Sequence, residues 1–119
     1  MQYSVIEKGA QRYILVNPGG RQIQTEQDGL DLVALCAQHG TSLLMIQAGA
    51  LTDDFFKLRT GLAGAIAQKF TQYGIKAVLV LDTSSIQGKF QDFIAESNRG
   101  ATLRAYNDSA EAETWLLSA

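Results

Sequence analysis

Hydrophobic residues along this chain occur in two patterns that alternate: short apolar runs, and apolar residues spaced three or four positions apart. Two segments, Ser42–Gln47 and Lys76–Asp82, are continuously apolar at their centres, as in strands that are covered on both faces of a sheet. Three shorter segments also favour strands: Tyr3–Glu7, Arg12–Val16 and Thr102–Tyr106. A turn-forming Lys8-Gly9-Ala10-Gln11 stretch joins the first two of these as a hairpin.

Four other segments place apolar residues three and four positions apart, which predicts amphipathic helices. The first helix is expected from the N-cap Thr25 to Gly40, with Asp28 completing a capping box. The longest is expected to run without interruption over Asp53–Tyr73. The last two are expected over Gly88–Asn98 and after Asp108.

The predicted elements follow one another in the order β-β-α-β-α-β-α-β-α. Strands that alternate with helices are joined by right-handed parallel crossovers, and the opening hairpin adds one antiparallel pair. The pattern therefore predicts an α/β fold with a mixed, mostly parallel sheet. Because no repeat, low-complexity segment or linker interrupts it, we expect residues 1–119 to form a single domain.

Charge and composition narrow the classes of partner. The net charge is −2, and the ten lysines and arginines are scattered, so we expect no nucleic-acid partner. No apolar run approaches the ~20 residues of a membrane span, and the first residues show no secretory leader. With one cysteine, no internal disulfide is available. We expect a cytoplasmic protein without a membrane partner.

Few residues suit catalysis or metal binding. The single Cys36 and the single His39 lie three apart on one helix, which permits a thiolate–imidazole pair. Burial of Cys36 and a capping position for His39 explain the same spacing more simply. No nucleophile motif for a serine enzyme is present. We therefore expect no catalytic residues, no metal and no cofactor.

A rim of polar residues at the predicted strand ends supports a different hypothesis. Ligands of α/β sheets bind where parallel strands end, and Asp53, Asp54, Asp82 and Asp108 lie at or just after such ends. Several carboxylates close together would attract a divalent cation. Helix capping and turn formation account for the same residues, so we do not expect a tight metal site there.

Two polar segments are candidates for contact with a ligand or partner. Their residues are Arg59, Thr60, Gly61 and Gly64, and, at the end of the third helix, Glu96, Asn98 and Arg99. A glycine inside a helix costs up to about 1 kcal/mol relative to alanine, which close approach of another backbone would offset. That backbone would belong to this domain or to a second copy. Solvated helix-face residues are the simpler interpretation of Arg59 and Thr60, and a helix C-cap that complements the dipole is the simpler interpretation of the second segment.

Four segments together resemble a bacterial family known as domain of unknown function 4180. They are Glu26–Leu32, Asp54–Gly64 with Gln68–Phe70, Phe90–Gly100 and Glu111–Leu116. The resemblance covers about Glu26 to Leu116. At Ala65 this chain departs from the family, which usually has an acidic residue there.

The resemblance implies a scaffold but no activity. The family is grouped with the STAS-like (sulphate-transporter and anti-sigma-antagonist) superfamily, whose element order agrees with the one predicted here. Anti-sigma-factor antagonists of that superfamily carry a switch serine in an Asp-Ser-Ser-Gly-like motif after the third strand. The corresponding residues here, Thr52–Phe56, lack the motif, and Thr60 lies about two turns further on. We expect no phosphoswitch at Thr60.

These observations leave two functional hypotheses. The first is a non-enzymatic regulatory or protein-interaction module of STAS-like type, forming a homodimer and binding a regulatory protein. The surfaces expected for the dimer are the small-residue face at Gly61 and Gly64 and the terminal Trp115-Leu116-Leu117. The alternative is a small-molecule-binding protein or a hydrolase that uses the acidic rim. A flat apolar patch would favour the first, and a deep cleft with perturbed carboxylates the second.

Overall fold

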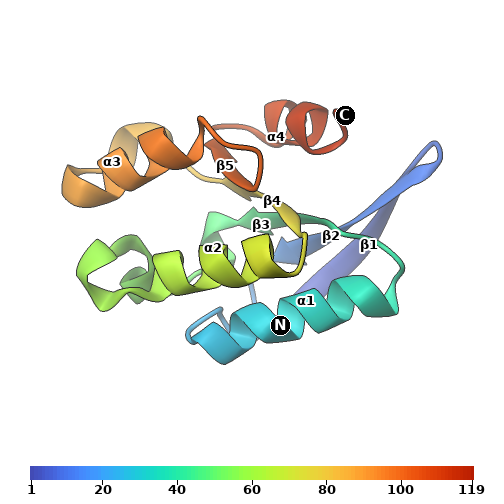
Figure 1. The fold of residues 1–119 in the computed structure, drawn as a ribbon, viewed down its shortest axis with the longest axis horizontal. Coiled ribbons are helices and arrows are strands. Elements are labelled where there is room, and N and C mark those ends of the chain that lie inside the picture. The colour runs from blue at the N-terminus through green and yellow to red at the C-terminus, as the bar shows by residue number, and fades with distance from the viewer.

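The computed structural model describes every residue from Met1 to Ala119 and shows an α/β fold with one mixed sheet (Figure 1). The strands are β1 (Gln2–Lys8), β2 (Gln11–Asn17), β3 (Leu43–Gln47), β4 (Lys76–Val80) and β5 (Leu103–Tyr106). The α-helices are α1 (Glu26–Gln38), α2 (Leu62–Gln72), α3 (Gly88–Ser97) and α4 (Ser109–Leu116). The predicted fold class and element order are confirmed. None of the helices is long and apolar enough to cross a membrane.

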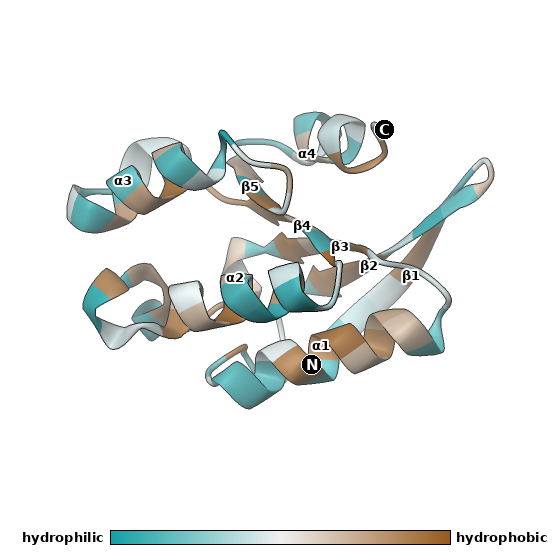
Figure 2. Cartoon of the chain, in the orientation of Figure 1, coloured by the Kyte–Doolittle hydropathy of each residue, from teal (hydrophilic) through white to brown (hydrophobic).

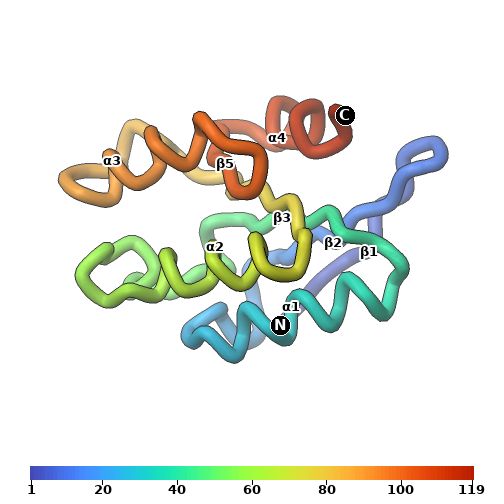
Figure 3. Tube along the Cα trace, in the orientation of Figure 1, coloured from blue at the N-terminus to red at the C-terminus, as the bar shows by residue number.

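The strands lie in the sheet in chain order, from β1 to β5. β1 is antiparallel to β2, and all other neighbours are parallel. The β1–β2 hairpin turns through Gly9, at φ +59°, and its tip projects from the body of the molecule (Figure 3). Because each right-handed crossover moves to the next strand in the same direction, α1, α2 and α3 come to lie on one face. α4 follows the last strand and covers the opposite face.

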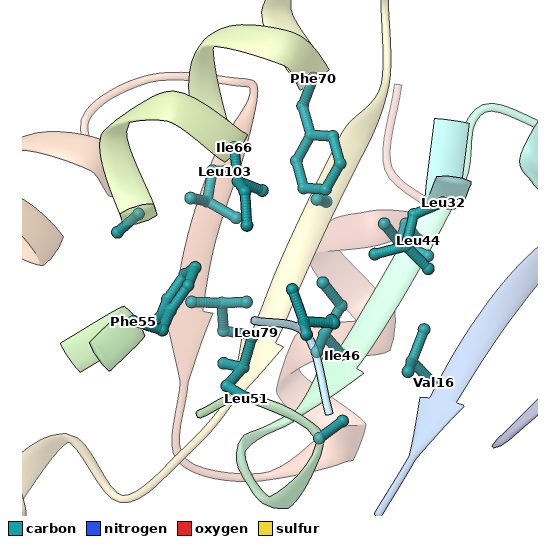
Figure 4. Packing of buried hydrophobic residues seen from close by; sticks show 14 of the residues in the cluster. Val16, Leu32, Leu44, Ile46, Leu51, Phe55, Ile66, Phe70, Leu79 and Leu103 are labelled. Carbon is teal, nitrogen blue, oxygen red and sulfur yellow. The ribbon is translucent and has the colours of Figure 1, made fainter. Parts of the chain in front are cut away.

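Alternate side chains of β3 and β4 enter two separate apolar layers, and Figure 2 shows these central strands as apolar. Leu44 and Leu79 belong to the larger layer, between the sheet and α1–α3, part of which is drawn in Figure 4. Met45 and Val78 belong to the smaller layer, where they pack with Leu116 of α4. This two-sided burial explains why both strands are continuously apolar in sequence.

α4 is held to the sheet by polar contacts as well as by packing. The Lys76 ammonium donates to the backbone carbonyls of Trp115 and Ser118, both at 2.8 Å, and lies 4.6 Å from the Trp115 ring centroid. Arg104 approaches the same ring at 4.9 Å. Partial burial, with Arg104 adding to it, lowers the pKa of Lys76. Trp115 and Leu116, expected as part of a dimer surface, thus take part in packing within the domain.

The start of α1 is built around a buried carboxylate. Thr25 and Asp28 form the predicted capping box, which is confirmed, and Arg21 donates to both Asp28 oxygens at 3.2 Å. Burial alone would raise the pKa of Asp28. The backbone N–H groups of Gln24 and Thr25, together with Arg21, outweigh it and lower that pKa.

The uninterrupted helix expected over Asp53–Tyr73 is wrong in its first part. The chain instead forms two 3₁₀ turns, Asp53–Phe56 and Leu58–Thr60, and α2 begins only after Gly61. Gly61 has φ +76°, a left-handed conformation that a continuous helix does not allow. The Thr60 hydroxyl donates to the Asp54 and Lys57 carbonyls, at 2.8 and 2.9 Å, and so closes the turns by side-chain bonds.

Close contacts to a glycine backbone within the domain are made by side chains, and they occur at glycines other than the two expected. Gly61 lies outside the helix, and a Cβ added at Gly64 would have no neighbour within 4 Å. A Cβ at Gly29 in α1 would instead lie 3.2 Å from the Ile66 side chain of α2. A Cβ at Gly49 would lie 3.0 Å from the rigid ring of Pro18. Gly61 and Gly64 therefore face open space at the start of α2, whereas Ala63 between them is buried.

These environments predict opposite effects for two glycine-to-alanine substitutions. Gly64→Ala should raise the free energy of unfolding by up to about 1 kcal/mol, because alanine favours a helix and has space there. Gly49→Ala should lower it by about 1–3 kcal/mol through overpacking against Pro18. Urea denaturation of the three proteins measures both. A destabilised Gly64→Ala would contradict the open surface at α2.

Candidate functional site

The parallel strands β2 to β5 end at one edge of the sheet, as the sequence predicts, but their polar residues form separate pairs there. The Gln47 amide donates to the Asn17 side chain at 3.4 Å. The Thr83 hydroxyl and backbone N–H both donate to the Asn107 side chain, at 2.9 Å. The side-chain amides at the strand ends therefore form hydrogen bonds with each other or with the adjacent loop.

Between these pairs, at the ends of β3 and β4, lies an apolar hollow of about 390 Å³. Its apolar lining consists of Ala48, Phe56, Leu81, Ile86 and Phe90. Asp82, Ser85 and Gln87 form the polar part of its wall, and all three are exposed. The volume falls within the ordinary range of small-ligand pockets, about 300–1,000 Å³.

A cluster of aromatic side chains builds one wall of the hollow. Phe56 and Phe90 meet edge to face with ring centroids 5.4 Å apart, and Phe55 packs beside both of them. Phe55 is buried, whereas its neighbour Phe56 is half-buried in the wall. The 3₁₀ turn that replaces the expected helix places these two consecutive rings together beside α3. The helical spacing in the sequence places both residues in a helix and does not reveal the hollow, and the adjacent Phe-Phe pair is the local sign of it.

Asp82 is a carboxylate on the wall of this hollow. The Ser84 hydroxyl donates to Asp82 Oδ1 at 2.6 Å and the Ser84 backbone N–H at 3.0 Å. These two bonds, the hydroxyl first, lower the pKa of Asp82. Asp82 is therefore ionised at neutral pH, which suits it to accept a hydrogen bond or meet a cation. A general acid needs the opposite shift.

The other carboxylates of the predicted rim have local roles. Asp108 caps α4 by accepting the Glu111 N–H at 2.7 Å, and the neighbouring Asp108 raises the pKa of Glu111. Asp53 and Asp54 are exposed in the first 3₁₀ turn. Nowhere in the chain do three His, Cys, Asp or Glu side chains gather as a metal-binding group.

The first group of candidate residues lies at the start of α2. Thr60 and Gly61 line a small, more polar hollow of about 290 Å³, beside Glu26 and Asp54. Arg59 is exposed. The Thr60 hydroxyl is engaged in the turn that precedes Gly61. This group is separate from the aromatic hollow.

The second group ends α3. Glu96 and Arg99 form an exposed ion pair at 3.3 Å. The Asn98 side-chain amide contacts β5: its oxygen accepts the Ala105 N–H at 2.8 Å, and its nitrogen donates to the Ala105 carbonyl at 3.2 Å. Asn98 thus pairs with the backbone of the edge strand. No hydrogen bond or ion pair joins this group to the residues at the start of α2.

Cys36 and His39 do not act together. Cys36 is fully buried, and burial raises the pKa of its thiol to about 11. The His39 ring lies against Tyr3, with Nε2 3.3 Å from the Tyr3 hydroxyl. At neutral pH Cys36 is a protonated thiol in the apolar core, without thiolate character.

The fold and site define a single α/β domain with an apolar hollow at the carboxyl edge of a mixed sheet. Residues 8–116 match the family described as Domain of unknown function (DUF4180), and the chain belongs to this family. The resemblance found in the four sequence segments is confirmed. Neither a curated protein nor a solved structure matches the chain.

The bonds of Thr60 lead to a prediction for the turn beside α2. Thr60→Ala should lower the free energy of unfolding by about 1 kcal/mol, since the hydroxyl bonds to Asp54 and Lys57 are lost. Thr60→Ser keeps the hydroxyl and should retain most of that stability. Urea denaturation of both variants checks this, and equal stability of Thr60→Ala and the unaltered protein would contradict the role assigned to the hydroxyl.

Proposed function

We propose that this protein is a non-enzymatic interaction module whose aromatic hollow binds an apolar side chain of a regulatory partner protein. The hollow is neither a flat patch nor a deep cleft, and its mainly apolar lining is the observation that carries the proposal. The half-buried Phe56 and Ile86 and the buried Phe90 line a space of about 390 Å³ that is partly open to solvent. Covering apolar surface of this kind releases about 25 cal/mol for each Å² removed from water.

The charge beside the hollow indicates what kind of segment binds. Asp82 is ionised and exposed on its wall. Large side chains that fill a central pocket contribute most of the binding energy of many interfaces, and a surrounding polar rim fixes their orientation. We therefore expect the partner to insert an aromatic or large aliphatic side chain, with a lysine or arginine nearby to meet Asp82.

We also propose that the domain belongs to the STAS-like superfamily. The element order and the mixed five-stranded sheet are consistent with a STAS-like domain. We place the chain with STAS-like interaction modules on this likeness of architecture. Fold alone does not define function, so the proposal depends on the hollow.

A small molecule is the second candidate for the same hollow. Its volume suits a ligand, and Ser85 and Gln87 provide polar groups beside Asp82. A hydrolytic version of this hypothesis is less well supported. The carboxylate in the wall has a lowered pKa and is bonded to Ser84, so it does not fit a proton donor in catalysis.

Affinity capture from native lysate with three versions of the protein tests the proposal. Ile86→Asp places a charge in the wall of the hollow. Tyr73→Asp is the matched control, because Tyr73 is an exposed aromatic residue at the end of α2, outside the lining. We expect a protein that is captured by the unaltered chain and by Tyr73→Asp, and lost with Ile86→Asp. Circular dichroism checks that each variant is folded.

Two results would contradict the proposed function. Capture of the same proteins by all three versions would show that the hollow is not the binding surface. Release of a small molecule on denaturation, from the unaltered protein and Tyr73→Asp but not from Ile86→Asp, would favour the second candidate instead. Mass spectrometry of the released material distinguishes these cases.

A further inference from the structure

The two edges of the sheet differ in how their backbone groups are used. At the β5 edge, the Asn98 amide occupies both the N–H and the carbonyl of Ala105. The Ser97 hydroxyl donates to the carbonyl of Leu103 on the same strand. Side chains from the end of α3 therefore take the positions that another strand would need. This is one way in which proteins protect an edge from pairing with other chains.

The β1 edge has no such protection. β1 is seven residues long, and its backbone makes no hydrogen bond to any group outside its pairing with β2. Two of the three exposed large hydrophobic side chains of the protein, Tyr3 and Val5, lie on this strand, 39% and 37% exposed. A long, open edge with exposed apolar residues is a surface suited to pairing with another strand.

The hairpin geometry shows which backbone groups are free. Lys8 and Gln11 flank the two-residue Gly9-Ala10 turn and so form a hydrogen-bonded pair. Hydrogen-bonded pairs alternate along an antiparallel ladder. The N–H and carbonyl groups of Tyr3, Val5 and Glu7 therefore point away from β2, to the open edge.

We propose that β1 pairs antiparallel with β1 of a second copy of this chain, forming a homodimer with one continuous sheet. In the register that we infer, the twofold axis passes beside Val5, which faces the partner's Val5. Tyr3 then faces the partner's Glu7, and Glu7 faces the partner's Tyr3. This surface lies apart from the aromatic hollow, so the inference goes beyond the proposed function.

Three features support a second copy as the occupant and this register as the arrangement. Tyr3, Val5 and Glu7 have both outward backbone groups and side chains on the same face, so each opposite pair can exchange two hydrogen bonds. The Val5 side chains cover each other. Glu7 faces a tyrosine and Lys8 faces Gln2, so no like charges are opposed. A strand that complements itself in this way gives the isologous contact typical of homodimers.

Sedimentation equilibrium of the full chain and of Val5 variants tests the proposal. The unaltered protein should be dimeric at about 100 µM, a concentration that detects weak interfaces. Val5→Lys and Val5→Glu should each weaken self-association by about tenfold or more, because two like charges face each other at the axis. Val5→Thr, which keeps a β-branched side chain, should leave the dimer intact. Circular dichroism confirms that each variant is folded.

Mixing the charged variants tests the register itself. An equimolar mixture of Val5→Lys and Val5→Glu should restore dimers, since lysine then faces glutamate. Should these variants not fold, Tyr3→Glu and Tyr3→Lys replace them: the first opposes the partner's Glu7 and weakens the dimer, and the second does not. A monomeric unaltered protein at about 100 µM would overturn the proposal. So would a Val5→Lys dimer of unaltered affinity, or a mixture that stays monomeric.

Discussion

Strands β3 and β4 bury successive side chains in opposite directions, and the arrangement of the other elements depends on this. Leu44 and Leu79 need a cover on one face of the sheet, and Met45 and Val78 need a cover on the other. The helices of three right-handed crossovers, α1, α2 and α3, cover the first face. They cannot cover the second, so α4 returns across the opposite face, where Lys76 bonds to the carbonyls of Trp115 in α4 and of Ser118 just after it.

Both proposed binding surfaces lie where this two-sided cover of the sheet ends. At the carboxyl edge, the chain leaves β3 through short 3₁₀ turns, which place Phe56 beside Phe90 and leave a hollow next to the ionised Asp82. At the sides of the sheet, α3 protects β5 through Asn98, whereas β1 has no covering side chains on its backbone. A partner segment at the hollow and a second copy at β1 would use separate surfaces, so one protein can bind both at once.

The sequence predicts most of the fold because its pattern is local and strong. The apolar runs of β3 and β4, the capping box at Thr25 and the glycine ends of the helices each determine their own element. The break before α2 is less visible, because Phe55, Leu58 and Leu62 keep helical spacing across it. The helix is interrupted there by the left-handed conformation of Gly61 and by the hydrogen bonds of the Thr60 hydroxyl.

The candidate site is harder to predict than the fold. Its walls come from the residue after β3, the 3₁₀ turn Asp53–Phe56, the segment that follows β4 and the start of α3, so that residues between Ala48 and Phe90 are brought together. Asn98 illustrates the same limit. In sequence it belongs to a polar helix end, and only the fold brings its amide to the backbone of Ala105. Contacts of this kind depend on tertiary geometry, which residue patterns alone do not describe.

Residue-resolved hydrogen exchange of the protein at low concentration tests most directly whether two-sided burial organises the molecule. The amides of Leu44–Ile46 and Ala77–Leu79 should exchange most slowly, through global unfolding. The Ala105 amide should be protected by Asn98 although β5 is an edge strand, whereas the outward amide of Val5 should exchange far faster. Exchange of the Val78 amide as fast as that of Val5 would contradict this role of two-sided burial.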